Sequence, residues 1–429
     1  MHFLLVHPWI TDVAAYNFWI RPLGLYSLSE WLWERRASFF LLDCLTSPAP
    51  GKFKRKRLPL PIHLRGLDRA FSRYGIPESE FDRKIEKAGD FDAVLMTSDM
   101  SYWYPGVQQA VQKIKGKRSD VPVILGGIYA TLWPEHARKF SGADHFFEGP
   151  LEKNSHALSS LLNLPVQPIR KKRPWHKLSL HDGMSFSAIS TSRGCPFRCT
   201  YCASLKISGS FAPRKPEEII DELSSLSSLG VTDISFYDDA LLMDFSSRLL
   251  PVLDELQRLG LSFRFHTPNG LHARMIDEEM AAWFKKANFA TIRLSLETTN
   301  PLRQEETGAK VNNAQVESAV KLLIRAGIPA ENIGVYLMIG LPGQDLKEVF
   351  EGMAFVRSLG VRPYLSEYSP IPGTPDWNRL LSMGIVSKDM DPILTNNTVF
   401  FRKFCGYEQN EIEKIIMEMR GKKGCLKSP

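Results

Sequence analysis

One stretch of this chain decides how the rest is interpreted: Gly194-Cys195-Pro196-Phe197-Arg198-Cys199-Thr200-Tyr201-Cys202. It places three cysteines within eight residues, spaced as CxxxCxxC, with an aromatic residue directly before the last cysteine. Three thiolates on one loop cannot all pair as disulfides, but they can converge on one metal centre. Three ligands leave a fourth coordination position open, so the spacing indicates a cluster at which chemistry can take place.

A structural zinc site is the plainer alternative for such a cysteine loop. Zinc sites of that kind usually close with a fourth Cys or His, and their ligand pairs are typically separated by a longer stretch. His181 and His266 could supply the fourth ligand, although neither lies within the loop. Thiolates serve both metals, so the spacing favours an iron–sulfur cluster while leaving zinc open.

Composition is that of a globular protein: 429 residues, of which 44% are hydrophobic and 24% charged, enough for two or three domains. Six cysteines are too few for a disulfide scaffold, so a reduced, cytoplasmic setting is expected. No stretch approaches the roughly 20 apolar residues of a membrane helix, so no transmembrane segment is expected. The net charge of +7 includes basic runs at 52–57 and 170–173, interpreted as solvated loops, and no nucleic-acid partner is expected.

The first half of the chain predicts an α/β domain over residues 1–152. Apolar runs predict strands at 2–7, 38–44, 92–97 and 122–125, and helical spacing predicts helices at 23–35 and 106–115. Residues 46–76, rich in proline and basic residues, are predicted to be a loop. Strands that alternate with helices indicate a parallel sheet covered on both faces, a doubly wound Rossmann-like domain. Its ligand crevice would lie at the carboxyl ends of the strands.

The second half predicts a partial (β/α)6 TIM-type barrel over residues 185–375, after a proline-containing linker at 153–184 and before a helical tail at 376–429. Its strands are predicted at 187–191, 233–237, 262–267, 291–296, 334–339 and 363–367, with helices between them, for example at 216–229 and 313–326. In such barrels chemistry gathers at the C-terminal ends of the strands. The cysteine loop directly follows the first of these strands, where a cofactor is expected.

This combination resembles the radical SAM superfamily, whose signature is a CxxxCxxC loop after the first barrel strand, here with Tyr201 as the aromatic residue. The resemblance implies a [4Fe–4S] cluster held by Cys195, Cys199 and Cys202, which are the metal ligands and the expected catalytic residues. S-adenosylmethionine (SAM) would chelate the fourth iron. Reduction would then cleave SAM to a 5′-deoxyadenosyl radical that abstracts hydrogen from a substrate. The protein positions and shields this chemistry.

Other strand ends resemble the family's SAM contacts. The second barrel strand ends at Asp238 and Asp239, where many family members have Gly-Gly-Glu, and either carboxylate suits the SAM ammonium group. A strand-end turn or helix cap is the alternative for each. The fourth strand ends with Ser295 and Glu297, which are two residues apart and are therefore expected to share the face towards the barrel interior. The expected cofactor-binding residues are Tyr201, Asp238, Asp239, Ser295 and Glu297.

The N-terminal half resembles the cobalamin-binding domains that precede the barrel in one large subgroup of the superfamily. The matching positions are Pro22, Leu23, Gly24, Leu25, Gly126, Gly127, Thr131, Pro134, Glu135, Asp144, Gly149 and Glu152. The Asp-x-His-x-x-Gly motif, whose His binds cobalt, is missing: residues 97–106 at the corresponding strand end contain no His. Bulky Tyr102, Trp103 and Tyr104 could fill part of the pocket. Cobalamin is expected either to bind without a protein ligand or to have been lost, leaving a scaffold or substrate platform.

Three functions follow from these patterns. The favoured interpretation is a radical SAM enzyme without cobalamin that abstracts hydrogen from its substrate. The alternative is a cobalamin-dependent methyltransferase acting on an unactivated carbon, and the third is a non-catalytic iron–sulfur or zinc protein. The implied partners are a small-molecule or peptide substrate and an electron donor such as flavodoxin or ferredoxin. The sequence leaves the substrate open, because this fold supports many chemistries.

Overall fold

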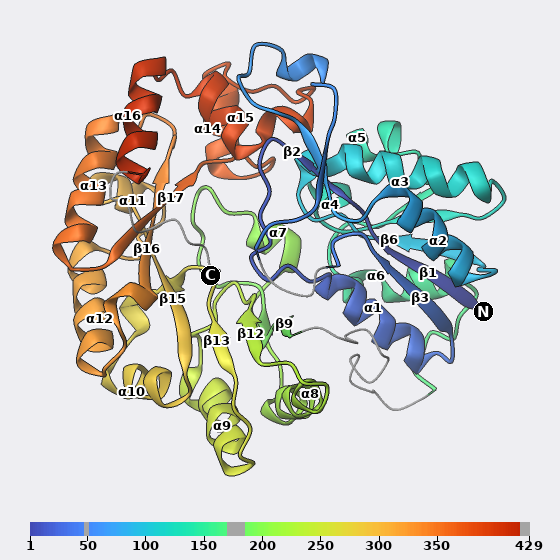
Figure 1. The fold of residues 1–429 in the computed structure, drawn as a ribbon, viewed down its shortest axis with the longest axis horizontal. Helices are drawn as coiled ribbons and strands as arrows, with labels where there is room; N and C mark the ends of the chain where they lie inside the picture. The colour runs from blue at the N-terminus through green and yellow to red at the C-terminus, as the bar shows by residue number, and fades with distance from the viewer. Residues whose placement is uncertain (47–50, 170–184, 421–429) are drawn as a thin grey trace. The chain divides into compact units, whose positions relative to one another are not determined.

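The computed structural model describes residues 1–46, 51–169 and 185–420. The chain divides into two compact units, an N-terminal unit formed mainly before residue 185 and a barrel unit formed mainly after it (Figure 1). The short segments 206–209 and 391–394 belong by their contacts to the N-terminal unit. Predictions made for His181 and for the second basic run fall outside the described residues. None of the described helices is both long and apolar enough to cross a membrane.

A five-stranded sheet organises the N-terminal unit, in the order β3-β1-β6-β7-β8, and every neighbouring pair is parallel. Its strands are β1 (His2–His7), β3 (Ser38–Asp43), β6 (Ala93–Met96), β7 (Val123–Leu125) and β8 (His145–Phe146). After β1, the chain adds β3 on one side of it and β6 on the other side. The topological switch point therefore lies between β1 and β6. The predicted Rossmann-like fold is confirmed.

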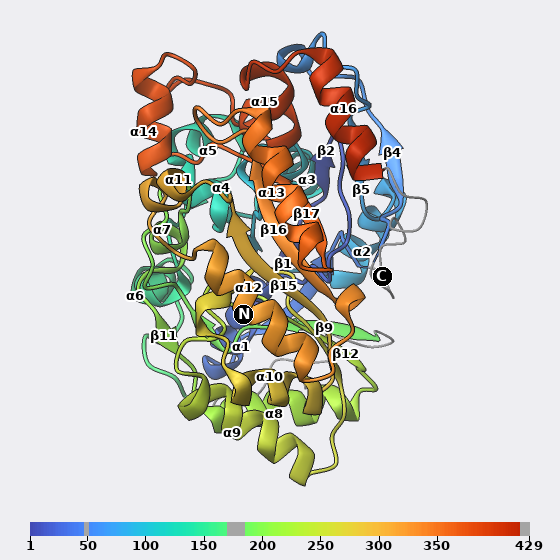
Figure 2. The same ribbon diagram turned by 90° about the vertical axis from the view of Figure 1, so that its left-hand side faces the viewer.

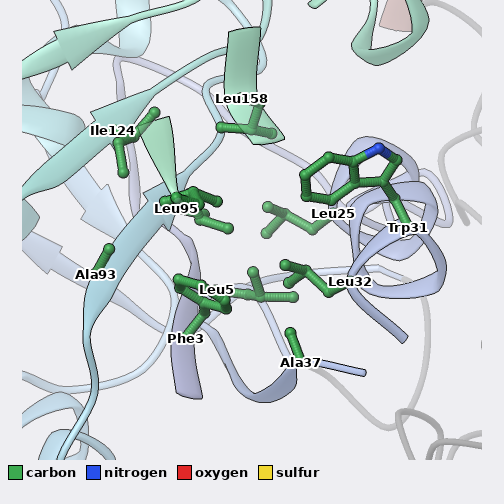
Figure 3. Packing of buried hydrophobic residues seen from close by; sticks show 11 residues of the cluster. Phe3, Leu5, Leu25, Trp31, Leu32, Ala37, Ala93, Leu95, Ile124 and Leu158 are labelled. Carbon is green, nitrogen blue, oxygen red and sulfur yellow. The ribbon is translucent and has the colours of Figure 1, made fainter. Parts of the chain in front are cut away.

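Both faces of this sheet are covered, because residues 3–6 of the central strand β1 are all fully buried. Phe3 and Leu5 belong to a core cluster on one face, closed by α1 (Leu23–Glu34) and α6 (Leu151–Leu161), as Figure 3 shows. The other helices of the unit are α2 (Glu78–Ala88), α3 (Tyr104–Lys117), α4 (Ile128–Leu132) and α5 (Pro134–Phe140).

Two segments predicted to be irregular form regular elements. Residues 153–161, the first part of the predicted linker, belong to α6 and pack on the sheet. Residues 46–76, predicted to be a loop, contribute β4 (Arg55–Arg57) and β5 (Ser72–Tyr74) to an antiparallel sheet with β2 (Ile10–Asp12). These strands are three residues long, too short to show an alternating pattern in the sequence.

The barrel unit is built on six parallel strands that neighbour one another in chain order, β9-β12-β13-β15-β16-β17. They are β9 (Phe186–Ile189), β12 (Asp233–Phe236), β13 (Arg264–His266), β15 (Phe289–Glu297), β16 (Ile333–Ile339) and β17 (Arg362–Glu367). Among the described residues β9 and β17 do not pair with each other, so the barrel is open. The predicted partial barrel is confirmed.

Helices line the outside of this sheet, as the βα pattern predicts. Figure 2 shows α12 and α13 lying along β15 and β16, with α10 beside α12. The main helices are α8 (Pro216–Ser228), α9 (Phe245–Arg258), α10 (Glu278–Lys286), α12 (Asn313–Arg325) and α13 (Leu346–Ser358). Shorter elements between them are β10 (Ser192–Arg193), α7 (Ser204–Ser208), β11 (Ala212–Pro213), β14 (Leu271–His272) and α11 (Pro301–Glu306). The helical tail contains α14 (Pro375–Ser382), α15 (Asn397–Phe404) and α16 (Gln409–Arg420).

The N-terminal core tests whether the sheet carries the stability of its unit. Leu5→Ala removes a fully buried side chain from the cluster and is expected to lower the free energy of unfolding by about 2–5 kcal/mol. Ile62→Ala, at a side chain that is 64% exposed in the same unit, is the control and should change it by less than about 0.5 kcal/mol. Urea unfolding followed by circular dichroism measures both, and equal effects would contradict the assigned core.

Candidate functional site

The cysteine loop follows β9, the first strand of the barrel, as predicted. Cys199 is buried, Cys195 is half-buried and Cys202 is exposed as a residue. A glycine lets another loop pack tightly against it: Gly308 has φ +109°, and a Cβ there would lie only 3.2 Å from the Cα of Cys199. The cysteine loop is therefore supported from outside by the segment that follows β15.

The chemistry of the three thiols fits a cluster. Burial raises the pKa of Cys195. The sulfur of Cys202 is also surrounded by protein, and its pKa is raised to about 11. The nearby Cys199 and Asp239 contribute to both shifts. Such thiols become thiolate ligands when a cationic centre binds them. Within the described residues no three His, Cys, Asp or Glu side chains are close enough to share one metal ion. Which metal the cysteine loop binds therefore stays a prediction.

An aromatic residue inside the loop fixes it to the neighbouring strand. The Phe197 ring centroid lies 4.4 Å from that of His272 on β14, and the guanidinium carbon of Arg274 lies 4.4 Å from the Phe197 ring centroid. Burial, together with the charges of Lys310 and Arg274, lowers the pKa of His272 to about 3. His272 is therefore a neutral packing partner of the loop, a role that only the fold reveals.

Of the two carboxylates that follow β12, Asp238 has a structural role. Its side chain is fully buried. It accepts hydrogen bonds from the Thr191 N–H (3.0 Å), the Thr191 hydroxyl (2.7 Å) and the Ser192 hydroxyl (2.6 Å), and it lies 3.9 Å from Arg248. These contacts agree with the interpretation of Asp238 as part of a strand-end turn, because they enclose its carboxylate between β9 and β12.

Asp239, by contrast, lies beside the cysteine loop. It accepts a hydrogen bond from the Ser204 hydroxyl (2.7 Å), and the Ser204 N–H in turn points to the sulfur of Cys202 at 3.4 Å. Its half-buried carboxylate also contributes to the raised pKa of Cys195 and Cys202, so its negative charge lies near both sulfurs. Of the predicted pair, Asp239 is the one placed to meet the ammonium group of a cofactor at the loop.

The expectation that Ser295 and Glu297 share a face of their strand stays a prediction. Ser295 pairs with Tyr336 and Glu297 pairs with the next residue, Leu337, because the register shifts between them. Burial raises the pKa of Tyr336, and Glu297 raises it further, so Glu297 lies near the residue that pairs with Ser295. Ser295 is 3% exposed and enclosed, since a Cβ on Gly270 would lie 2.0 Å from its hydroxyl oxygen. Its role as a SAM contact stays a prediction.

Glu297 belongs to a charged group beside the cluster loop that includes a lysine missed from the sequence. Its carboxylate lies 3.5 Å from the Lys310 ammonium, and both side chains are mostly buried. Burial raises the pKa of Tyr201, and the neighbouring Glu297 and Cys199 raise it further, so the phenol lies between them and stays neutral. Glu297 also has a left-handed φ of 68°, a strained conformation that often marks functional positions. Lys310 is a lone lysine in a loop and carries no sequence signal.

His266, considered above as a possible fourth zinc ligand, is a structural residue. Its Nδ1 lies 2.9 Å from the Thr291 hydroxyl and its Nε2 lies 2.9 Å from the Asp233 carboxylate. Burial lowers the pKa of His266. Both ring nitrogens are thus occupied within the sheet, and His266 links β12, β13 and β15.

Of the positions that resemble a cobalamin-binding domain, Gly126, Gly127, Thr131 and Gly149 follow the carboxyl ends of β7 and β8. The Ser98 hydroxyl donates to the carbonyl of Gly126 (3.0 Å), and the Thr131 hydroxyl accepts from the Gly149 N–H (2.8 Å). Gly127 has φ +87°, and a Cβ there would lie 2.5 Å from the carbonyl oxygen of Ser98. These contacts join the loops that follow β6, β7 and β8 at one edge of the sheet.

Comparison with known proteins identifies the family. Residues 189–356 match the family model described as the Radical SAM superfamily, a segment that includes the cysteine loop and strands β12 to β16. By this match residues 189–356 belong to the radical SAM superfamily, a Rossmann-like unit precedes the barrel, and the chain is a radical SAM enzyme. The family implies a [4Fe–4S] cluster and SAM.

Among curated relatives, the chain is 26% identical over 340 residues to the protein named Uncharacterized methyltransferase PH0819 of Pyrococcus horikoshii, covering 71% of this chain and 72% of that protein. It is 26% identical over 200 residues to the ribosomal protein uS12 methylthiotransferase RimO of Solibacter usitatus, covering 42% of each chain. The match to RimO thus spans less than half of either protein.

Two solved structures share the two-unit fold. The radical SAM methyltransferase TsrM of Kitasatospora setae, solved with tryptophan and a SAM analogue, matches with a TM-score of 0.66 at 16% identity, covering 89% of this chain and 76% of that one. The cobalamin-dependent radical SAM enzyme OxsB matches with a TM-score of 0.58 at 13% identity, covering 96% of this chain and 56% of that one. At these identities the likeness shows the fold.

Removing one cluster ligand tests the cysteine assignment. Cys199→Ala is expected to abolish the visible absorbance of the anaerobically reconstituted protein and its cleavage of SAM, because two thiolates cannot hold the cluster. Cys44→Ala, at a buried thiol of the N-terminal unit, is the control and should retain both. SAM cleavage that persists in Cys199→Ala would contradict the assignment.

The two aspartates should respond differently to the same substitution. Asp239→Asn is expected to weaken SAM binding roughly 10- to 100-fold with little change in stability, because it removes a charge facing the cofactor. Asp238→Asn is expected to lower the free energy of unfolding by about 1–3 kcal/mol, because it disturbs a buried hydrogen-bonded group. Equilibrium dialysis with SAM and urea unfolding measure the two effects, and the reverse pattern would exchange the roles.

Proposed function

We propose that this chain is a cobalamin-dependent radical SAM methyltransferase. The observation that carries the proposal is that a solved radical SAM methyltransferase matches 89% of this chain, so that a single alignment spans both units. The relative from Pyrococcus horikoshii, also named a methyltransferase, matches over 71% of this chain. These similarities support the methyltransferase alternative over hydrogen abstraction without cobalamin.

In the barrel unit, each of the residues at the cysteine loop would have a role in this function. Cys195, Cys199 and Cys202 would hold the [4Fe–4S] cluster, which when bound and reduced supplies the electron that cleaves SAM. Asp239 would receive the SAM ammonium group, and Lys310, now paired with Glu297, would offer a cation to the SAM carboxylate. An electrostatic match at both ends would orient the sulfonium towards the cluster.

Within the N-terminal unit, the carboxyl edge of the sheet would hold cobalamin, whose cobalt supplies methyl-transfer chemistry. The hydroxyls of Ser98 and Thr131 hold the backbone of Gly126 and Gly127 at this edge, and these two partly exposed glycines would contact the cofactor through their backbone. The edge includes the switch point between β1 and β6, where open α/β sheets bind their ligands.

For the substrate and the electron donor of this enzyme we propose only a chemical class. The substrate would be a small molecule or a peptide with an unactivated carbon, and the cluster would need a one-electron donor such as flavodoxin or ferredoxin. The net charge of +7 and the exposed basic strand β4 are compatible with an acidic donor. A reducing cytoplasmic setting suits the five described cysteines, which are all free.

Cofactor retention and product analysis test the proposal. Anaerobically reconstituted protein incubated with hydroxocobalamin is expected to keep a corrinoid spectrum through gel filtration, at about one equivalent per chain. With SAM and reductant it should release S-adenosylhomocysteine as well as 5′-deoxyadenosine, because methyl transfer produces the first and radical formation the second. Mass spectrometry measures both products.

The same experiment separates the alternatives. Release of 5′-deoxyadenosine alone, with no corrinoid retained, would favour hydrogen abstraction without cobalamin. Release of neither product from a protein that carries an intact cluster would contradict both enzymatic proposals. The Cys199→Ala variant provides the baseline for SAM breakdown that does not depend on the cluster.

A further inference from the structure

Three charged side chains meet at the switch point of the N-terminal sheet. His7 ends β1, Asp43 ends β3 and Asp99 follows β6. The Nδ1 of His7 lies 2.7 Å from the Asp43 carboxylate, and its Nε2 lies 2.8 Å from the Asp99 carboxylate. The side chain of His7 is 2% exposed, whereas that of Asp99 is 31% exposed. The imidazole is enclosed between carboxylates from the two strands that flank its own.

This geometry defines the charge of the ring. Ionised carboxylates only accept hydrogen bonds, so both ring nitrogens must donate, and a ring that donates twice is an imidazolium. Burial lowers the pKa of His7, but the charges of Asp99 and Asp43 outweigh it and raise that pKa to about 10. Burial would raise the pKa of Asp43, but His7 and the facing Arg21 lower it. Tyr26, which also faces Arg21 and Asp43, stays neutral because burial raises its pKa.

The same geometry prevents His7 from binding a metal. A metal ligand needs a neutral imidazole with a free lone pair, and both nitrogens of His7 are engaged. The space beside the ring is a cavity of about 10 Å³, room for at most one water molecule. That cavity is lined by His7, Trp9, Asp99, Met100, Trp103 and Val107.

We propose that His7 is a charged clamp that joins the ends of β1, β3 and β6. As a clamp it cannot bind cobalt. It also holds Asp99 in place as the hydrogen-bond acceptor for a corrinoid at this edge of the sheet. The corrinoid part rests on the proposed function, whereas the clamp does not. A corrinoid carries carboxamide N–H groups around its ring, and the partly exposed carboxylate of Asp99 suits such donors. Its cobalt would then lack a histidine ligand from this unit's central strand.

Nitrogen NMR of the unloaded protein tests the clamp. In protein labelled with ¹⁵N-histidine, one ring that disappears in His7→Gln is expected to keep both nitrogens protonated up to about pH 9. Asp99→Asn should lower the pH at which this ring loses a proton, because one of its two carboxylate partners becomes neutral. His145→Gln, at an exposed position on β8, is the matched control and should leave the signal unchanged. A ring with one unprotonated nitrogen at pH 7 would overturn the clamp.

Stability should depend on pH in the corresponding direction. A pKa raised from 6.5 to about 10 on folding adds stability that is complete below pH 6.5 and is lost as pH rises through about 10. The melting temperature of the wild type is therefore expected to fall more steeply between pH 7 and 10 than that of His7→Gln. Parallel profiles would contradict a clamp that forms on folding.

Paramagnetic resonance of the corrinoid-loaded, reduced protein tests cobalt ligation. Spectra of samples prepared with ¹⁴N-histidine and ¹⁵N-histidine are expected to be identical, because no histidine nitrogen binds cobalt. A splitting that changes with the isotope and disappears in His7→Gln would overturn the proposal. Failure to retain any corrinoid would contradict the proposed function and the assigned role of Asp99, while the NMR experiment would still decide on the clamp.

Discussion

The candidate active site depends on one buried carboxylate. Asp238 receives three hydrogen bonds from Thr191 and Ser192, the residues that lead from β9 into the cysteine loop. A carboxylate this deeply buried is tolerated because donors surround it, and once satisfied it fixes the direction in which the loop leaves the strand. The places of the three sulfurs and of Asp239 follow from this connection between β9 and β12.

The geometry of a parallel sheet places the same constraint on both units. In a parallel sheet all strands end at one edge, so side chains far apart in sequence meet there. At the barrel edge this brings the cysteine loop close to Asp239 and to the Glu297–Lys310 pair. At the N-terminal edge it brings His7 between Asp43 and Asp99. In both groups opposite charges from different strand ends pair with each other.

Sequence patterns predicted the elements well and side-chain partners poorly. The six barrel strands were predictable because buried parallel strands are continuous apolar runs. The register shift between Ser295 and Glu297 was not predicted, because a bulge has no local signal in the sequence. His7 lies at the end of β1, outside residues 97–106, and no sequence pattern marks it. Its partners Asp43 and Asp99 are distant in sequence.

The sequence by itself determined the superfamily of the barrel, the cysteine loop that follows its first strand and the order of the two folds. A CxxxCxxC loop is a local feature, since three ligands on one loop need no distant residue, and apolar periodicity is local too. The tertiary structure alone decided that Asp238 is structural while Asp239 faces the cluster loop, that Lys310 joins Glu297, and that His7 is held between two carboxylates. These roles arise from contacts across strand ends, which depend on sheet order and register and are not encoded within any one segment.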